Sequence, residues 1–253
     1  MASPSNPVPD PLAEVLRENQ ELRSSLDRYV AAANSTGEQL QQFLYAASHD
    51  LQEPLRAVIT YAQLLDRHFS SDPAAHEYIG FVLDGAVRMR ELLQHLLAYS
   101  RAGSSRQRNV KDLNVPLQMA LLKLGPDITH SSAHIIRNPL PEALCDEGEI
   151  ALVFENLLSN SLKFRSTAAP VIAVTAEQGS DECTVSFRDN GLGIEPRYCD
   201  QALLPFKRIH SRSIPGSGLG LAICEKIIRA HDGRLWLESD GIHGTTVRFT
   251  LPL

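Results

Sequence analysis

The spacing of apolar residues constrains the fold most, because its period changes along the chain. Over most of the first hundred positions, apolar residues recur every three or four residues, which is the period of an amphipathic helix. After Ala102-Gly103-Ser104-Ser105, a candidate linker, short β-type runs alternate with helical segments. The sequence therefore predicts a long helical region followed by an α/β domain.

The first helical segment has the pattern of a coiled coil. Its seam follows alternating gaps of three and four residues, at Leu12, Val15, Asn19, Leu22, Leu26, Tyr29 and Ala33. Asn19 falls at an a position, where a buried amide favours a parallel dimer. We expect residues 1–11, which hold four prolines, to be a disordered lead-in and residues 12–37 to form a coiled-coil signalling helix. An amphipathic helix that packs on its own domain is the alternative.

Two further amphipathic helices are expected in residues 38–103. The first runs to about Phe69 through Pro54, which should bend it because proline removes an intrahelical hydrogen bond. Ser71-Asp72-Pro73 then supplies an N-cap and a proline at the first helical position, and the second helix follows. Each helix keeps an apolar stripe that one antiparallel hairpin cannot cover. Pairing of two hairpins into a four-helix bundle in a homodimer is the predicted solution.

The remaining residues, 104–253, are expected to form an α/β sandwich whose structure begins near Asn109. Strands are predicted near Val171–Glu177, Cys183–Asp189, Arg234–Glu238 and Thr245–Leu251. Helices are predicted at Asn114–Lys123, Glu147–Phe164 and Leu219–His231.

Composition and charge exclude several classes of protein. The formal net charge of −6 leaves no basic footprint for nucleic-acid binding. The four cysteines stand apart in the sequence, which indicates reduced thiols rather than a disulfide framework or a zinc site. No apolar run is long enough to span a bilayer, and the N-terminus lacks the pattern of a signal peptide. A cytoplasmic location is therefore expected.

Two segments carry candidate chemistry on predicted helices. His49 precedes Asp50, which could accept a hydrogen bond from one ring nitrogen and leave the other nucleophilic. Asn156, Asn160 and Lys163 share one helical face, where an amide oxygen suits Mg²⁺ and the lysine can reach phosphate oxygens. Taken alone, each pattern also fits an ordinary solvated surface.

Two glycine-containing segments complete the set. Asp189 ends a predicted strand before Gly191 and Gly193, and its carboxylate could accept a hydrogen bond from an exocyclic amine such as that of adenine. Pro215–Cys224 is a glycine-rich turn at the start of a helix, where backbone N–H groups can bind phosphates. It has neither the strand context of a dinucleotide-binding turn nor the lysine of a P-loop. Alone, each segment also fits an ordinary loop.

In this order, the four segments resemble the H, N, G1 and G2 boxes of sensor histidine kinases. Leu204-Pro205-Phe206-Lys207-Arg208 resembles the F box of that family, and Gly241–Phe249 resembles its closing strand. The resemblance extends from about Gln39 to Leu253, and Phe206–Cys224 looks most like the corresponding segment of phytochrome-type and related kinases.

The resemblance implies a dimerisation and phosphotransfer hairpin followed by a Bergerat-type ATP-binding domain, with ATP and Mg²⁺ as ligands. His49 would be the phospho-acceptor and Asp50 its polarising partner. Asn160 would coordinate Mg²⁺, supported by Asn156 and Lys163, and Asp189 would recognise adenine beside Gly191 and Gly193. Residues 194–215 would form a lid over the nucleotide, with Phe206 as its apolar anchor. The further nucleotide-contacting residues that it implies are Phe164, Gly216, Gly218, Leu219, Gly220 and Thr245.

The implied reaction is ATP-dependent autophosphorylation of His49, followed by transfer to an aspartate of a response-regulator receiver domain. A sensor domain or partner outside this chain would supply the input. Many relatives that also dephosphorylate their regulator carry Thr or Asn four residues after the histidine, where this chain has Glu53. A kinase-biased enzyme is therefore expected. The alternatives are another ATPase of the superfamily, such as a serine-kinase anti-sigma factor or a chaperone-type ATPase, and a dimeric scaffold without activity.

Overall fold

The computed structural model describes residues 51–253, except residues 71, 106, 211–213 and 215. The chain divides into two units, residues 1–47 and 48–253, and every described residue belongs to the second. The predicted lead-in, the predicted coiled coil, His49 and Asp50 lie outside the described residues.

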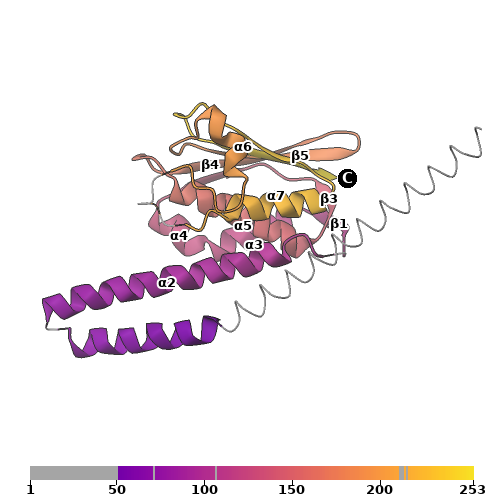
Figure 1. Ribbon diagram of the computed structural model, residues 1–253. Coiled ribbons are helices and arrows are strands. Elements are labelled where there is room, and N and C mark those ends of the chain that lie inside the picture. The colour runs from indigo at the N-terminus through magenta and orange to yellow at the C-terminus, as the bar shows by residue number, and fades with distance from the viewer. Residues whose placement is uncertain (1–50, 71, 106, 211–213, 215) are drawn as a thin grey trace, which may run out of the picture. The chain divides into compact units, whose positions relative to one another are not determined.

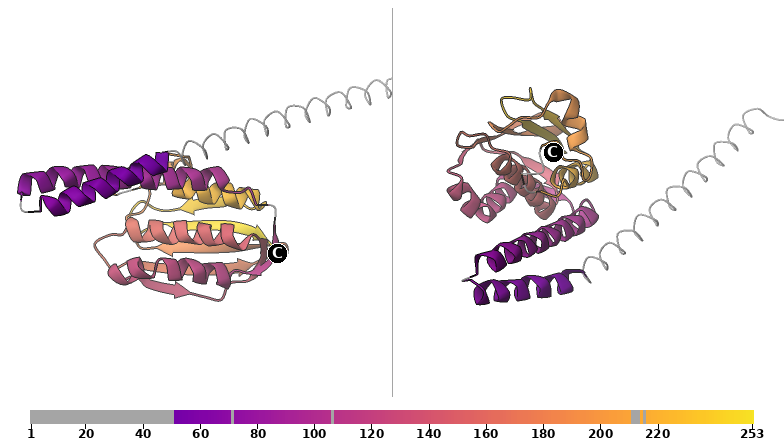
Figure 2. Two further views of the ribbon diagram at one scale, coloured as in Figure 1. Left: turned by 90° about the horizontal axis from the view of Figure 1, so that it is seen from below. Right: turned by 60° about the vertical axis from the view of Figure 1, so that its left-hand side comes forward.

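The described structure begins with a helical hairpin. Residues 51–68 are helical, and α2, Pro73–Arg101, runs back beside them (Figures 1 and 2). The predicted cap is confirmed, since the Asp72 carboxylate accepts hydrogen bonds from the N–H groups of Ala74 at 3.0 Å and Ala75 at 3.2 Å. Leu55, Ile59 and Ala86 form the buried centre of the hairpin. The bend at Pro54 stays a prediction, because the residues before position 51 are not described.

The second part is an α/β domain built on a five-stranded sheet in the order β2-β4-β5-β7-β6. Strand β2 is parallel to β4, and the other neighbours are antiparallel. Strands β1 and β3 form a separate antiparallel pair. The bounds of the strands are β1 Asn109–Asp112, β2 His134–Arg137, β3 Glu142–Cys145, β4 Val171–Gln178, β5 Glu182–Asp189, β6 Leu235–Glu238 and β7 Thr246–Pro252.

Three helices cover one face of this sheet (Figure 1). They are α3, Asn114–Lys123, α5, Glu147–Lys163, and α7, Gly220–Ala230, and α5 packs against both of the others. The shorter elements are α4, Gly125–His130, α6, Cys199–Ala202, and a 3₁₀ turn, Pro196–Tyr198. The α/β sandwich is thus confirmed, and the four predicted strands and three predicted helices agree with the structure within one residue at each end. The β1–β3 pair, β2, α4 and α6 were not predicted.

The core of the α/β domain lies between α5 and the sheet. The Phe154 ring lies 5.3 Å from that of Phe187 and 6.1 Å from that of Phe249, measured between centroids. The apolar face of α5 is fully buried here, so its polar face must point elsewhere. The Asp146 carboxylate caps the start of this helix by accepting a hydrogen bond from the Glu149 N–H at 2.9 Å.

The four cysteines lie in the interior of the α/β domain. All four cysteines are free and buried, and burial raises the pKa of the Cys145 thiol to about 11, so this thiol is protonated at neutral pH. None of the helices within the described residues is long and apolar enough to cross a membrane.

Candidate functional site

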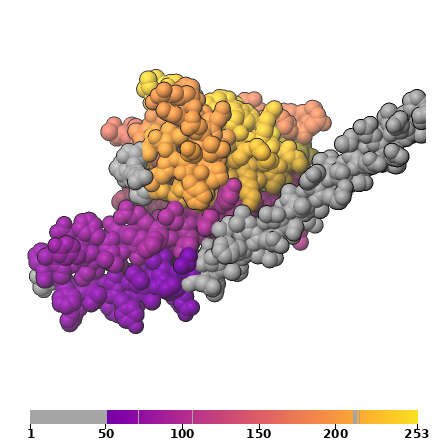
Figure 3. Space-filling model, viewed as in Figure 1, coloured from indigo at the N-terminus to yellow at the C-terminus, as the bar shows by residue number. Residues whose placement is uncertain are grey.

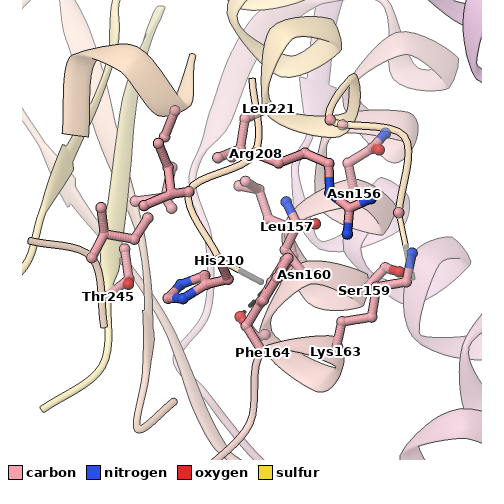
Figure 4. Close-up of a pocket in the computed structure, with 18 of the residues that line it drawn as sticks. Asn156, Leu157, Ser159, Asn160, Lys163, Phe164, Arg208, His210, Leu221 and Thr245 are labelled. Atoms are coloured by element: carbon pink, nitrogen blue, oxygen red, sulfur yellow. Dashed lines mark hydrogen bonds between the residues drawn. The ribbon is translucent and has the colours of Figure 1, made fainter. Parts of the chain in front are cut away.

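One pocket collects most of the predicted site residues. It lies beside the polar face of α5 and is closed by the end of β5, the loop after it and the glycine-rich turn before α7 (Figure 4). The predicted residues that line it are Asn156, Asn160, Lys163, Phe164, Asp189, Gly193, Gly216, Gly218, Gly220 and Thr245. Gly191, Phe206 and Leu219 are not among its lining residues.

The polar face of α5 forms one wall. Figure 4 shows Asn156, Asn160 and Lys163 projecting from the same side of this helix, as their spacing predicts. The Asn156 amide group donates a hydrogen bond to the carbonyl oxygen of Leu152 at 2.8 Å. A Cβ atom at Gly220 would lie 3.0 Å from the Asn156 Oδ1 atom, so a glycine lets the start of α7 approach this wall closely.

Asp189, the last residue of β5, is held firmly in the wall of the pocket next to α5. Its Oδ1 atom accepts hydrogen bonds from the N–H groups of Gly191 at 2.9 Å and Thr245 at 3.0 Å. Its Oδ2 atom accepts one from the Ser161 hydroxyl group at 3.2 Å. Hydrogen bonds to a carboxylate are strong, so its orientation is fixed, and further lone pairs stay available for a ligand. Ser161 was not predicted as a site residue, because it follows Asn160 on α5 but lies on the buried side of the helix.

The glycine-rich turn is the last part of the loop between α6 and α7, and it packs against an earlier part of the same loop. Gly218 has a φ of +71°, which favours glycine, and its carbonyl oxygen accepts a hydrogen bond from the Phe206 N–H at 2.9 Å. Leu219 is fully buried, so it ties the turn to the core instead of lining the pocket. The Phe206 side chain is 60% exposed, in contrast to the expected apolar anchor of a lid.

The same loop supplies residues that sequence analysis did not select. Lys207, Arg208 and His210 line the pocket, and the His210 ring lies 5.1 Å from the Phe164 ring (Figure 4). Lys207 and Arg208 belong to the F-box-like segment, and their positive charges were the signal that could have identified them. An aromatic pair beside cationic groups suits a planar ligand that carries anionic groups.

His95 reaches the pocket from α2, outside the α/β domain. Its Nδ1 atom is buried and has no hydrogen-bond partner among the described residues. Burial lowers the pKa of His95 and the nearby Lys163 lowers it further, whereas Glu91 and Glu155 oppose the shift. Nothing in the sequence distinguished this histidine from the other polar residues of its helix.

The donor set near α5 fits a hard cation better than a soft one. Asn156 and Asn160 offer amide oxygens, which suit Mg²⁺. Within residues 51–253, leaving aside the gaps named above, no group of three or more His, Cys, Asp or Glu side chains could hold a metal ion. A cation here would therefore need ligand oxygens from water or from a bound phosphate.

Comparison with known families agrees with this arrangement. Residues 39–105 match the His Kinase A (phospho-acceptor) domain, and residues 145–253 match the histidine kinase-, DNA gyrase B- and HSP90-like ATPase family. The second match implies that the α/β domain binds ATP.

Similar proteins include two cyanobacterial phytochromes. The chain is 39% identical over 243 residues to cyanobacterial phytochrome A of Nostoc sp., covering 94% of this chain and 31% of that protein. It is 35% identical over 243 residues to phytochrome-like protein Cph1 of Synechocystis sp., covering 94% of this chain and 32% of that protein. The chain thus spans about a third of the length of these relatives.

Solved structures share the fold. Full-length ShkA in complex with AMPPNP has a TM-score of 0.64 at 23% identity, with 83% of this chain and 45% of that chain covered. The Acinetobacter baumannii histidine kinase AdeS has a TM-score of 0.54 at 17% identity, with 79% and 97% covered. Since a phospho-acceptor domain is followed by an ATPase domain and the phytochrome relatives extend over both, the chain belongs to the sensor histidine kinases.

Proposed function

We propose that this chain is an ATP-dependent protein-histidine kinase, which phosphorylates His49 and passes the phosphoryl group to an aspartate of a response-regulator receiver domain. The observation that carries the proposal is the assembly of the amides of α5, Asp189 and the glycine-rich turn around one pocket. These groups come from three distant parts of the sequence, and together they offer an adenine acceptor, a cation site and phosphate donors.

The pocket divides naturally into two ends for the nucleotide. At one end, the Asp189 carboxylate would accept a hydrogen bond from the adenine amino group, with Thr245 beside it. At the other end, Lys163 and the backbone N–H groups between Gly216 and Gly220 would bind the phosphates. Asn160 would hold Mg²⁺, with support from Asn156. When bound, the ion would neutralise charge on the phosphate oxygens.

The reaction needs little covalent chemistry from the pocket. A ring nitrogen of His49 would form a bond to the γ-phosphorus atom as the bond between that atom and the β–γ bridging oxygen breaks, so that ADP leaves. Asp50 would accept the hydrogen bond of the other ring nitrogen and stabilise its positive charge. The pocket residues would contribute by positioning the γ-phosphate and by stabilising its charge, which are the main sources of catalysis in phosphoryl transfer.

The hairpin would serve as the dimer interface. Tyr78, Val82 and Met89 follow one another on α2 at helical spacing and are all exposed within a single chain. A second hairpin would bury this stripe in a four-helix bundle. We place the dimerisation and phosphotransfer domain at residues 38–103 and the ATP-binding domain at residues 104–253.

Glu53 supports a bias towards kinase activity. It is exposed in the helical segment 51–68, four positions after His49, and a carboxylate there does not replace the Thr or Asn of the phosphatase-competent relatives. Rapid release of phosphate from a phosphorylated regulator by the ADP-loaded protein would contradict this part of the proposal.

Phosphate transfer from γ-labelled ATP tests the proposal. With Mg²⁺, the full chain should gain acid-labile and alkali-stable label, and His49→Gln should gain none. Acid-stable label would favour a serine kinase of the same ATPase superfamily, although the match of residues 39–105 to a phospho-acceptor domain speaks against it. A chain that binds ATP but gains no label would favour the scaffold alternative.

A further inference from the structure

The C-terminal end of α2 is attached to the α/β domain through Lys226 of α7. The Lys226 ammonium group donates hydrogen bonds to the carbonyl oxygens of Tyr99 at 2.8 Å and Ser100 at 3.2 Å. It also lies 5.0 Å from the centroid of the Tyr99 ring. Figure 2 shows this part of α2 running beside α7.

This attachment stabilises the C-terminal end of α2. The last carbonyl groups of a helix lack intrahelical partners, and a positive charge near them is favourable. Ala102, the residue after α2, is buried in the core of the α/β domain, and Leu96 packs against that core. The expected flexible linker therefore begins with a residue that is firmly packed. Figure 3 shows the resulting contact between the surface of α2 and that of the α/β domain.

The attachment at Lys226 lies one helical turn after His95 on α2. Helix α7 begins at Gly220, directly after the glycine-rich turn. His95 lines the pocket together with Asn156, Ser159 and Lys163, and it lies close enough to Lys163 for that charge to lower its pKa.

The surroundings of His95 point to an anionic ligand. Its Nδ1 atom is buried without a hydrogen-bond partner in the described part of the chain, and a buried polar atom without a partner is costly. A phosphate group can accept the hydrogen bond of the imidazole N–H group. Lys163, the charged neighbour on the pocket wall, would bind the same anion.

We propose that His95 is a nucleotide-binding residue, which the hairpin helix contributes to the pocket and which contacts the polyphosphate, and that Lys226 is its positioning residue. This inference rests on the proposed function, since it concerns the same nucleotide. It makes ATP affinity depend on the docking of α2 against α7, so a signal that moves the hairpin would change nucleotide binding directly.

Titration calorimetry on the full chain can test the role of His95. We expect His95→Ala to weaken binding of Mg-ATP about tenfold, the effect of one hydrogen bond to a charged group, and to leave adenosine affinity unchanged. His130→Ala is the matched control, because His130 is exposed at the end of α4 and should leave both affinities unchanged. Equal ATP affinities for wild type and His95→Ala would overturn the inference.

The positioning role of Lys226 can be tested with one variant that removes its positive charge and one that keeps it. Lys226→Met should weaken ATP binding less than His95→Ala and leave adenosine binding unchanged, and Lys226→Arg should restore ATP affinity. Equal losses for ATP and adenosine would indicate a purely structural role and overturn the assignment. If the variants unfold, the ring resonances of His95 in the wild-type protein should shift with ATP and stay in place with adenosine. Equal shifts of the His95 resonances with ATP and with adenosine would contradict a contact between His95 and the polyphosphate.

These outcomes separate the inference from the proposed function. A wild-type chain that binds ATP with the help of His95 but gains no label at His49 would overturn the kinase proposal and support the inference. If the wild-type chain is labelled at His49 while His95→Ala binds ATP normally, the kinase proposal is supported and the inference about His95 is overturned.

Discussion

The α/β domain and the helical hairpin bury their apolar surface in different ways. The α/β domain encloses Phe154, Phe187 and Phe249 between its helices and its sheet within one chain. The hairpin has only a small buried centre and leaves a long row of large apolar side chains exposed, namely Leu51, Val58, Tyr61, Leu64, Leu65, Phe69, Tyr78, Phe81, Val82, Met89 and Leu92. The first region can fold from its own contacts, whereas the second depends on another surface.

The largest effect is expected in the core of the α/β domain. Phe154→Ala should lower the free energy of unfolding of this domain by about 3–5 kcal/mol, because it removes a fully buried ring and leaves a cavity. Urea titration followed by tryptophan fluorescence would report it through Trp236 on β6. The midpoint should be the same at low and high protein concentration. A midpoint that depends on protein concentration would show that this domain also needs a second chain to fold.

The hairpin should respond to a charge on its exposed stripe. Val82, 51% exposed in one chain, should be buried in the dimer, so Val82→Glu should raise the dimer dissociation constant at least about 100-fold, or ~2.7 kcal/mol. Light scattering across a dilution series measures this. Leu122→Glu on α3 is the matched control, because Leu122 is 70% exposed outside the hairpin. Equal increases in the dimer dissociation constant for the two substitutions would show that the hairpin stripe is not a special dimer interface.

Within the α/β domain, Asp189→Asn should weaken ligand binding more than it lowers the stability of the fold. Asp189→Asn replaces a charged acceptor at the pocket wall and should weaken ATP binding by about 1.5–3 kcal/mol, or about 10- to 100-fold. Calorimetry measures the affinity, and Asp200→Asn on the exposed side of α6 is the control. An unchanged ATP affinity for Asp189→Asn would contradict the assigned adenine site.

The smallest effect is expected at the cap of α5. Asp146→Ala should lower the free energy of unfolding by about 1 kcal/mol, measured by urea denaturation. Burial opposes ionisation of Asp146, but hydrogen bonds from Ser105 and from the N–H groups of Glu149 and Gly148 lower its pKa overall. Since the folded-state pKa is below the unfolded value, this contribution is present above about pH 4 and is lost as the pH falls further. A larger effect of the substitution at pH 2 than at pH 7 would contradict this.

The two regions also differ in how much could be predicted from the sequence. The period of 3.6 revealed α5 and α7, and the alternation of buried residues revealed β4 and β5, because each buries one regular face. Strands β1 and β2 were missed because they have four residues each and lie largely exposed, so neither shows a pattern. In the hairpin, the residue types Asp72-Pro73 predicted the cap, and the helical spacing of apolar residues predicted the stripe.

The site was predictable where one segment carries several functional residues. Asn156, Asn160 and Lys163 share one face of α5, and Gly216, Gly218 and Gly220 share one turn. Leu219 lies between those glycines, but its apolar side chain belongs to the core. Ser161 and His95 gave no signal, because Ser161 bonds to Asp189 from a distant strand and His95 reaches the pocket only through the packing of α2 on the α/β domain.

The most direct test of the central claim asks whether this pocket phosphorylates the hairpin. Wild-type chain and Asn160→Ala would be incubated with Mg-ATP under neutral conditions and mapped by mass spectrometry, after both are shown to be folded and dimeric. We expect a phosphoryl group on His49 in the wild type and its near-complete loss in Asn160→Ala. Equal phosphorylation of His49 in the two proteins, or wild-type phosphorylation at another residue, would contradict it.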